Sequence, residues 1–201
     1  MNNDPRAVLA ASPMRPAQIV VVALCIALNA LDGFDVLAIS FAAPGIAAEW
    51  GVDRATLGVV LSMELFGMAA GSVLIGNIAD RIGRRPTILS CLIVMTLGMA
   101  AALYANDVMT LSAVRFLTGI GIGGMLSSTS AMVAEFSNDR RRGLSMVLNI
   151  AGYSVGAISG GLVASGLLAT TGDWRSVFML GTAATAALIP LVVFFLPESI
   201  E

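Results

Sequence analysis

Four ionisable side chains lie inside stretches that are otherwise apolar, and they are the residues best suited to chemistry in this chain. They are Asp32, Asp35, Glu64 and Arg115. A buried carboxyl group that stands near an arginine can exchange a proton close to neutral pH. An arginine offers a planar pair of N–H donors that matches a carboxylate ligand. These residue types predict proton coupling at Asp32 or Asp35 and substrate binding at Arg115.

The spacing predicts that the four side chains share one layer. In a membrane-spanning helix each residue adds about 1.5 Å. Asp32 then lies about 22 Å from the start of the first apolar stretch, and Glu64 and Arg115 lie about 10 Å from the opposite face of the membrane. One arginine with three carboxylates at one depth favours a water-lined cavity over a single structural ion pair. For Glu64 an orientation toward a neighbouring helix stays open, beside a role in substrate binding.

The apolar stretches that carry these residues predict an all-α membrane protein. The chain has 201 residues, of which 57% are hydrophobic and 12% are charged. That charged fraction is about half of what a soluble domain carries, and one span needs about 20 apolar residues. We expect a disordered cytoplasmic tail over residues 1–16 and a six-helix transmembrane domain over residues 17–201. The predicted spans are about 17–48, 57–79, 86–105, 108–135, 143–169 and 174–196.

The arginines predict how these spans are oriented. If six spans alternate, eight of the eleven basic residues fall on one side, namely Arg6, Arg15, Arg81, Arg84, Arg85, Arg140, Arg141 and Arg142. Only Arg54 and Arg175 fall on the other side. Basic loops stay in the cytoplasm, so both termini are expected there. Short loops make neighbouring helices antiparallel, and the two sets of three spans then form a 3+3 inverted repeat.

Other classes of function find little support. The chain has no histidine, so proton coupling would depend on carboxyl groups, and no cluster of residue types suggests a metal site, a cofactor or an enzyme. A net charge of −2 gives no reason to expect nucleic acid as a partner. The lipid bilayer is the expected surrounding. Tyr153, near the middle of a span, is a candidate contact for a substrate ring because its hydroxyl needs a partner there.

Two charged segments at the cytoplasmic side predict an inner gate. The first runs from Gly76 to Pro86, as a short turn between two spans, and the second covers residues 137–142. A salt-bridge network between them would hold helices together while the inside is closed; the alternative is that these charges only set the topology. The gate residues are Gly76, Asp80, Arg81, Gly83, Arg84, Arg85, Glu135 and Arg142. Pairs such as Gly67-x-x-x-Gly71 and Gly119-x-x-x-Gly123 predict close helix contacts.

The segment G-x-x-A-D-R-x-G-R-R, from Gly76 to Arg85, resembles the signature loop of the major facilitator superfamily of transporters. The run Leu111-x-x-x-Arg115-x-x-x-Gly119 is similar to the fourth-helix motif of the same superfamily. The glycine run from Gly152 to Gly161 resembles the fifth-helix antiporter motif but has Ala157 in place of the motif's proline. This departure favours symport over drug efflux.

A narrower resemblance is to the aromatic acid:proton symporter family. It rests on Asp32-Gly33-Phe34-Asp35, on the run from Arg115 to Gly119 and on Pro197-Glu198-Ser199. The resemblance implies proton-coupled uptake of benzoate, hydroxybenzoates or related small carboxylates across a bacterial inner (plasma) membrane. It also implies that Asp32, Asp35 and Arg115 are the functional residues.

The main departure from the superfamily is length, because its members usually have twelve spans. The resemblance therefore implies half of a major facilitator fold, which needs a second six-helix half or a homodimer to transport. Two alternatives remain. A sugar or other organic-solute symporter would need polar residues within the spans, where the chain offers Asn29, Asn77 and Asn149, with Gln18 as its one glutamine. A truncated, non-transporting membrane fragment is the other.

Overall fold

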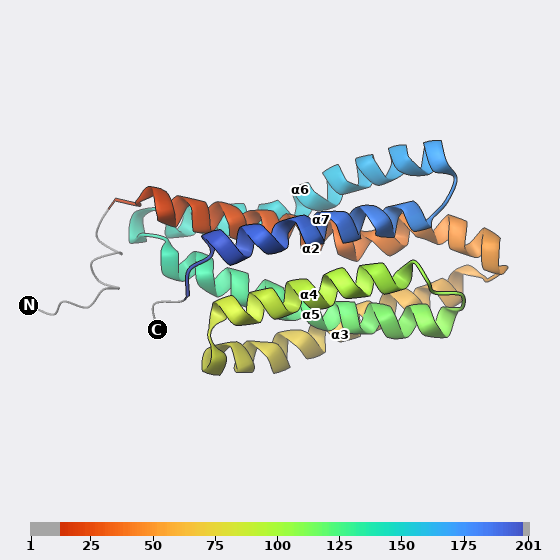
Figure 1. The fold of residues 1–201 in the computed structure, drawn as a ribbon, viewed down its shortest axis with the longest axis horizontal. Helices are drawn as coiled ribbons and strands as arrows, with labels where there is room; N and C mark the ends of the chain where they lie inside the picture. Colours follow the sequence, from red (N-terminus) through yellow and green to blue (C-terminus); the bar gives the residue numbers. More distant parts are fainter. Residues whose placement is uncertain (1–12, 199–201) are drawn as a thin grey trace, which may run out of the picture.

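The computed structural model describes residues 13–198, and in it six helices lie side by side along one axis (Figure 1). They are α2 (Pro16–Trp50), α3 (Arg54–Ile82), α4 (Arg84–Ala102), α5 (Val108–Phe136), α6 (Asp139–Thr171) and α7 (Arg175–Phe195). All six are long and apolar enough to cross a membrane, and no strand occurs within residues 13–198. The prediction of an all-α membrane protein with six spanning helices is confirmed.

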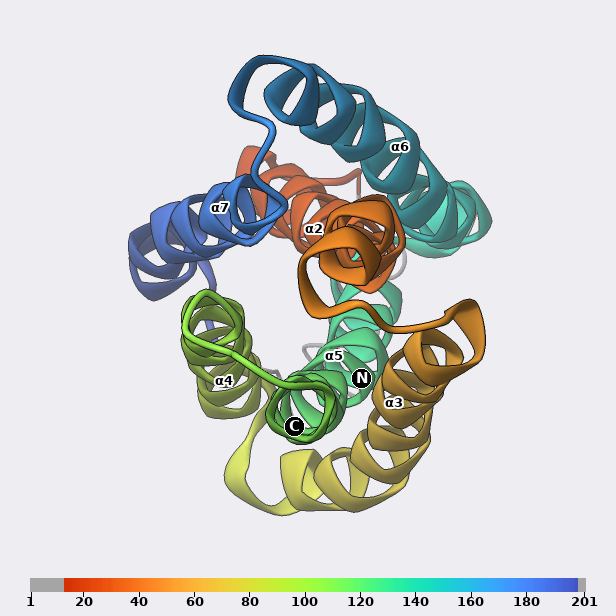
Figure 2. The same cartoon turned by 90° about the vertical axis from the view of Figure 1, so that its right-hand side faces the viewer.

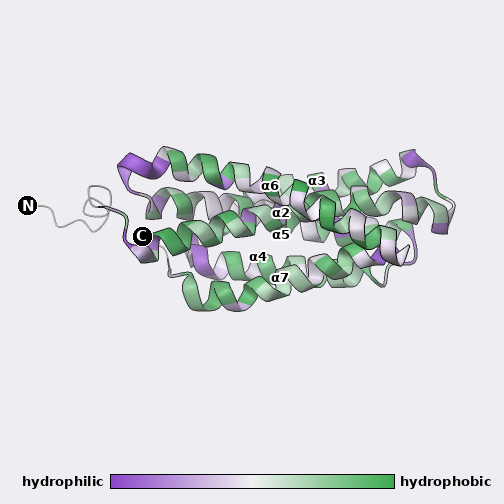
Figure 3. Cartoon of the chain, turned by 90° about the horizontal axis from the view of Figure 1, so that it is seen from above, coloured by the Kyte–Doolittle hydropathy of each residue, from purple (hydrophilic) through white to green (hydrophobic). Residues whose placement is uncertain are grey.

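Polar residues gather at the two ends of the bundle, and the length between them is largely hydrophobic (Figure 3). The start of α2 and the end of α7 lie at the same end, together with the α3–α4 and α5–α6 turns (Figure 1). We call this the arginine-rich end, because Arg81, Arg84 and the run 140–142 lie there. Residues 1–12 of the predicted tail, and Ser199, lie outside the described residues.

Four of the six helices cover their predicted spans and extend beyond them, whereas α4 ends three residues before its predicted end at residue 105 and α7 is one residue shorter at each end than the predicted 174–196. The segment from Gly76 to Pro86, which we expected as a turn, is almost entirely helical, and Gly83 alone separates α3 from α4. Gly83 has a φ of 99°, a conformation that residues with a Cβ rarely adopt. The arginine run 140–142 likewise forms the first turn of α6, because Asn138 caps that helix by accepting from the Arg141 N–H at 3.0 Å. The position of a capping residue or a glycine sets where a helix ends, and this position can lie beyond the hydrocarbon layer.

The two central helices are α2 and α5. Viewed along the bundle, α6 and α7 lie on one side of this pair and α3 and α4 lie on the other (Figure 2). Accordingly α2 and α5 bury the largest share of their apolar windows. Residues carried on the inner faces of α2 and α5 are thus held in the middle of the molecule.

Glycines set how closely neighbouring helices approach. A Cβ on Gly67 or Gly71 of α3 would collide with backbone carbonyls of α5, at Phe116 and Ile120. On the other side of the bundle, a Cβ on Gly156 of α6 would collide with the carbonyl of Ala30 in α2. Small residues permit this backbone contact in lipid. The α3–α5 and α2–α6 pairs therefore hold their polar side chains at fixed depth.

Candidate functional site

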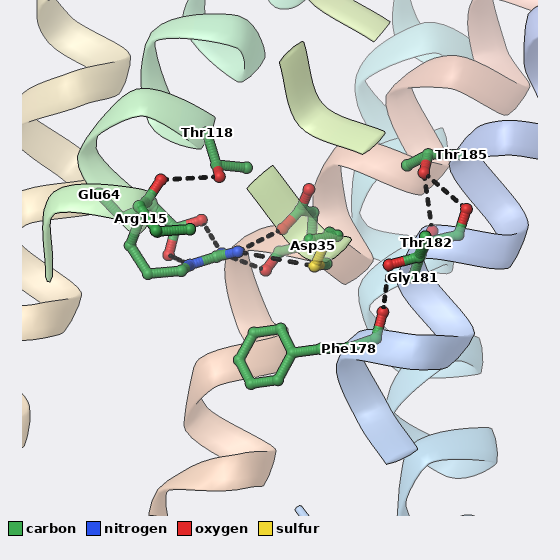
Figure 4. Close-up of polar contacts among 10 residues, drawn as sticks. Asp35, Glu64, Arg115, Thr118, Phe178, Gly181, Thr182 and Thr185 are labelled. Carbon is green, nitrogen blue, oxygen red and sulfur yellow. Dashed lines mark hydrogen bonds and ion pairs between the residues drawn. The ribbon is translucent and has the colours of Figure 1, made fainter. Parts of the chain in front are cut away.

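Arg115 of α5 lies at the centre of a buried cluster of charges. Its Nη1–H donates to Asp35 Oδ1 of α2 at 2.8 Å, and its Nε–H donates to Glu64 Oε2 of α3 at 3.1 Å. Nη2 donates to the backbone carbonyl of Asp35 at 2.8 Å and also to Glu64 Oε1. Figure 4 shows the guanidinium reaching between the two carboxylates, which come from opposite sides. One arginine thus joins three helices.

No part of this cluster reaches the surface. Asp35 and Arg115 have no exposed area, and Glu64 is 1% exposed. Nη1 also points at Met99 Sδ of α4, at 3.7 Å, and the Phe178 ring of α7 lies 5.8 Å from the Arg115 Cζ atom. The nitrogens of Arg115 are all engaged by protein atoms. A further carboxylate could bind Arg115 only by displacing one of its present partners.

Close backbone contact brings Glu64 and Arg115 together. Gly119, one turn after Arg115, lies against the backbone carbonyl of Glu64, where any Cβ would collide. Because Gly119 has no side chain, α3 and α5 can meet at this depth. Glu64 and Arg115 then lie close enough to bond along this contact. In the structure Glu64 points toward Arg115 of the neighbouring helix α5.

Asp32 lies one turn before Asp35, on the same buried side of α2, but does not contact Arg115. Neither of its carboxyl oxygens has a hydrogen-bond partner within residues 13–198, and the side chain has no exposed area. Cys91 of α4 and Tyr153 of α6 lie within electrostatic range of it. The pair predicted for proton coupling therefore divides into a bonded member, Asp35, and an unbonded one, Asp32.

Tyr153 lies in α6, beside α2, and is partly exposed. Its backbone carbonyl packs against Gly33, where a Cβ would collide. It is also within electrostatic range of Asp32, Asp35 and Glu64. The structure thus brings Tyr153 near the charged layer, from the side opposite α3.

At the arginine-rich end, some of the predicted gate residues meet and others do not. Arg84 Nη2 lies 2.6 Å from Asp80 Oδ1, and its Nε lies 4.0 Å from Glu135 Oε1 of α5. Arg85 donates from Nη2 to the Val193 carbonyl of α7 at 2.7 Å. The remaining gate residues have other positions: Gly76 packs loosely near Ser127, Gly83 forms the turn, and Arg81 and Arg142 are exposed.

At the opposite end, a cluster that sequence reasoning missed joins α2 to α7. Arg175 forms two bonds to Glu49, at 2.8 and 2.9 Å, and the Trp174 indole N–H donates to Glu49 at 2.7 Å. Trp174 makes edge-to-face contacts with Trp50 and with Phe178. The sequence signal was weak, because Trp174 and Arg175 stand alone at the start of an apolar stretch. Phe178 links this cluster to Arg115.

The comparisons with known proteins agree with this architecture. Residues 23–200 match the model of the Major Facilitator Superfamily. The chain is 35% identical over 196 residues to a 4-hydroxybenzoate transporter of Pseudomonas aeruginosa, covering 98% of this chain and 44% of that protein. It is 33% identical to a gallate transporter of Pseudomonas putida and 30% identical to a benzoate transport protein of Acinetobacter baylyi, covering 93% and 94% of this chain and 41% of each relative.

Solved structures give the same fold. A partially occluded, inward-open structure of the xylose transporter from E. coli matches with a TM-score of 0.82 and 19% identity, over 92% of this chain and 49% of that one. At that identity the likeness concerns the fold alone. The chain spans less than half the length of the curated relatives it matches. Because the relatives are transporters, the prediction that the chain is not an enzyme is confirmed, and the chain belongs to the major facilitator superfamily.

Proposed function

We propose that this chain is part of a proton-coupled transporter that takes up aromatic acids or related small carboxylates. The observation that carries the proposal is the buried Arg115, which is held by two carboxylates from two other helices. Charged groups at this depth are expensive in a membrane and mark the path of an ion or substrate. The names of the relatives, which are transporters of 4-hydroxybenzoate, gallate and benzoate, suggest the substrate class.

Competition for Arg115 would couple the substrate to the proton. The guanidinium donates to Asp35 and to Glu64 in the closed cluster. A proton that arrives on either carboxyl group removes its charge and weakens its bond to the arginine. The donor that is released can then bind the substrate carboxylate. In this scheme proton and substrate bind together, which is what a symporter requires.

Asp32 is the candidate carrier for the exchanged proton. Its carboxyl oxygens have no protein partner within residues 13–198, and Asp35 follows it by one turn. A carboxyl group that is not tied to an arginine can take up a proton without breaking an ion pair and can then pass it to Asp35, whose bond to Arg115 the proton weakens. Tyr153 is the candidate contact for the substrate ring, because it lies near the charged layer and is not fully covered.

We further infer a second six-helix unit, either a separate half or a second copy of this chain. The relatives are more than twice as long as the segment they share with this chain. Both α3 and α6 carry exposed apolar rows, with Phe66 and Val73 on the first and Val155 and Leu162 on the second. The inner-gate contacts of Arg84 would hold the arginine-rich end closed between transport steps. That end would face the cytoplasm of a bacterial cell.

The test is uptake of labelled 4-hydroxybenzoate into cells that express this chain, alone or together with the second half of a related transporter. We expect uptake that a protonophore abolishes and that Asp32→Asn and Arg115→Gln each remove. Asn106→Leu is the matched control, since Asn106 is an exposed residue in the turn between α4 and α5, outside the spans and the predicted gate.

Three results would contradict the proposal. Uptake that continues in the presence of a protonophore would remove the proton from the mechanism. Uptake of xylose but of no aromatic acid, in cells where the protein is inserted normally, would favour the sugar alternative. If no uptake occurs either with this chain alone or with the second half present, the result would support a non-transporting fragment.

A further inference from the structure

A pair of buried amides lies between α2 and α6, closer to the arginine-rich end than Asp32. Asn29 Nδ2–H donates to the backbone carbonyl of Asn149 at 2.6 Å. Asn29 is 3% exposed and Asn149 has no exposed area. The donor must be the Asn29 NH₂ group, because a carbonyl can only accept. This bond therefore fixes the orientation of the Asn29 amide.

Three polar atoms of this pair lack a partner in the described part of the chain. They are Asn29 Oδ1, Asn149 Oδ1 and Asn149 Nδ2. Buried polar atoms without a partner are rare, and inside a membrane no outside water can compensate. Two acceptors and a donor, on two residues that the Asn29–Asn149 bond brings together, suit water, which donates two bonds and accepts others. The amide pair thus has the chemistry of an internal water site.

One member of the pair lies one helical turn from Asp32. Asn29 precedes Asp32 by three residues and so shares its face of the helix. Asn149 precedes Tyr153 by four residues on α6, and Tyr153 is within electrostatic range of Asp32. The titratable groups around Asp32 are Asp35 on its own helix, Cys91 on α4 and Tyr153 on α6. The two carboxyl oxygens of Asp32 lack partners just as the amides do.

We propose that Asn29 and Asn149 hold water that carries the proton between Asp32 and the arginine-rich end of the bundle. This inference rests on the proposed function, since it gives the proton of Asp32 a route. The Asp32 O–H bond breaks as its proton passes to a water held by the amides, and that water passes a proton onward to bulk water. The amides keep their own protons throughout. Asn29 and Asn149 are positioning residues, because they act through the water.

Water fits this place better than the substrate does. The amides face the α2–α6 contact inside one six-helix unit, where Gly152 of α6 packs against Ile26 and Gly156 packs against Ala30. A cavity of about 450 Å³ borders this contact at Ala30 and Gly156, but neither asparagine lines it, so an aromatic ring held there would not reach the amides. Toward the arginine-rich end, the same side of α2 carries the buried Cys25 and Val22. This apolar layer would separate the water from the arginine-rich end until the helices move.

The first test needs no substrate. It measures, in the complete transporter, how fast the proton of Asp32 exchanges for deuterium. The exchange shifts the infrared C=O band of protonated Asp32, and this band is assigned by its loss in Asp32→Asn. We expect Asn149→Leu to slow this exchange by at least about tenfold. This is a cautious lower limit, because a positioned group that transfers a proton usually contributes a factor of about 10²–10⁴ to a rate. Asn149→Ser, which leaves room for a water and a polar partner, should restore most of the rate. Asn106→Leu is again the matched control.

The second test separates transport steps. Net proton-driven uptake of 4-hydroxybenzoate requires the proton to leave, whereas exchange of labelled for unlabelled substrate does not. We expect Asn149→Leu to lose net uptake and to keep exchange with an unchanged KM, which a variant that merely misfolds would not do. Equal loss of both activities with a raised KM would overturn the water site and make Asn149 a substrate contact. If the unmodified protein transports no aromatic acid, the proposed function fails, while the infrared rates still decide on the water site.

Discussion

At the scale of single residues, the notable feature is that Arg115 is both buried and fully bonded. Removing a charged group from water is costly, and the attraction between ions repays it only when the remaining donors and acceptors are satisfied. The nitrogens of Arg115 meet that condition, through Asp35, Glu64 and the Asp35 carbonyl, while Asp35 Oδ2 has no partner within residues 13–198. Such an arrangement is stable as a set and fragile when one member is removed. In the proposed mechanism this fragility is useful, since a single proton would switch the set.

Removing the arginine alone should therefore destabilise the protein strongly. Arg115→Gln leaves two carboxylates buried without a counter-charge, and breaking a buried pair in this way costs about 3–5 kcal/mol. The double variant Arg115→Gln with Glu64→Gln removes one of those charges and should recover part of the loss. Thermal unfolding in detergent, followed for the single and double variants, measures both effects. If Arg115→Gln unfolds at the same temperature as the unmodified protein, the three groups do not form a stabilising set of ion pairs.

At the scale of helices, the α3–α5 contact sets the geometry of the site. Gly123 of α5 lies against the backbone carbonyl of Met68, where a Cβ would collide, while nothing lies within 4 Å of a Cβ built on Gly58 of α3. Gly123→Ala should separate the helices and destabilise the protein by about 1–3 kcal/mol, as overpacking does. Gly58→Ala should be neutral or stabilising by up to about 1 kcal/mol.

Thermal unfolding of the two variants checks this, and uptake by Gly123→Ala should fall along with its stability. Equal behaviour of Gly123→Ala and Gly58→Ala would contradict the close contact, because both changes add the same methyl group to a helix.

The start of α5 predicts a dependence on pH. Asp107 accepts from the Thr110 backbone N–H at 2.8 Å and from the Thr110 hydroxyl at 2.7 Å. These bonds, the backbone one first, lower the pKa of Asp107 below its usual value. A lowered pKa stabilises the folded state above the pKa of the unfolded aspartate, about 3.9. The contribution is lost as the pH falls through the lower folded pKa.

The variant Asp107→Asn keeps a capping side chain that cannot titrate. Between pH 5 and pH 3, taken as about one unit on either side of the ordinary pKa, the unfolding temperature of the unmodified protein should fall more steeply than that of Asp107→Asn. Parallel curves would show that the Asp107 carboxylate adds nothing to the cap. Asp53→Asn at the start of α3, where Asp53 accepts from the Thr56 N–H at 2.9 Å, repeats the test independently.

At the scale of the whole molecule, the sequence predicts the spans and the depth of each charge but not the rotation of each helix. Long apolar runs give the six helices, and residue counts bring Asp35, Glu64 and Arg115 to one level. Asp32 and Asp35 share a face by spacing, so spacing cannot tell which of them pairs with Arg115. Packing decides that choice, and it also decides that Phe178 approaches Arg115.

The same limit applies at the ends of the bundle. The charged segment from Gly76 to Pro86 has the composition of a loop, yet a single glycine turns the chain there. Arg84 contacts Glu135 while Arg142 is exposed, although both were predicted to form the gate. Contacts between helix ends depend on tilt and on exact helix length, neither of which a hydrophobic pattern records.

The orientation of the molecule in the membrane follows from its arginines and can be tested directly. The only cysteines, Cys25 and Cys91, are free and buried, so a new surface cysteine can be labelled with little background. Asn106, between α4 and α5, and Asp139, at the start of α6, are exposed at opposite ends of the bundle. A membrane-impermeant maleimide should label Asn106→Cys in intact cells and Asp139→Cys only after permeabilisation, because we expect the arginine-rich end to lie in the cytoplasm. Both changes leave every arginine in place, so the charge bias under test is not altered. The reverse pattern would put Arg84 and its gate contacts outside the cell, and protons driving uptake would then reach Asp32 from the end we assign to their release.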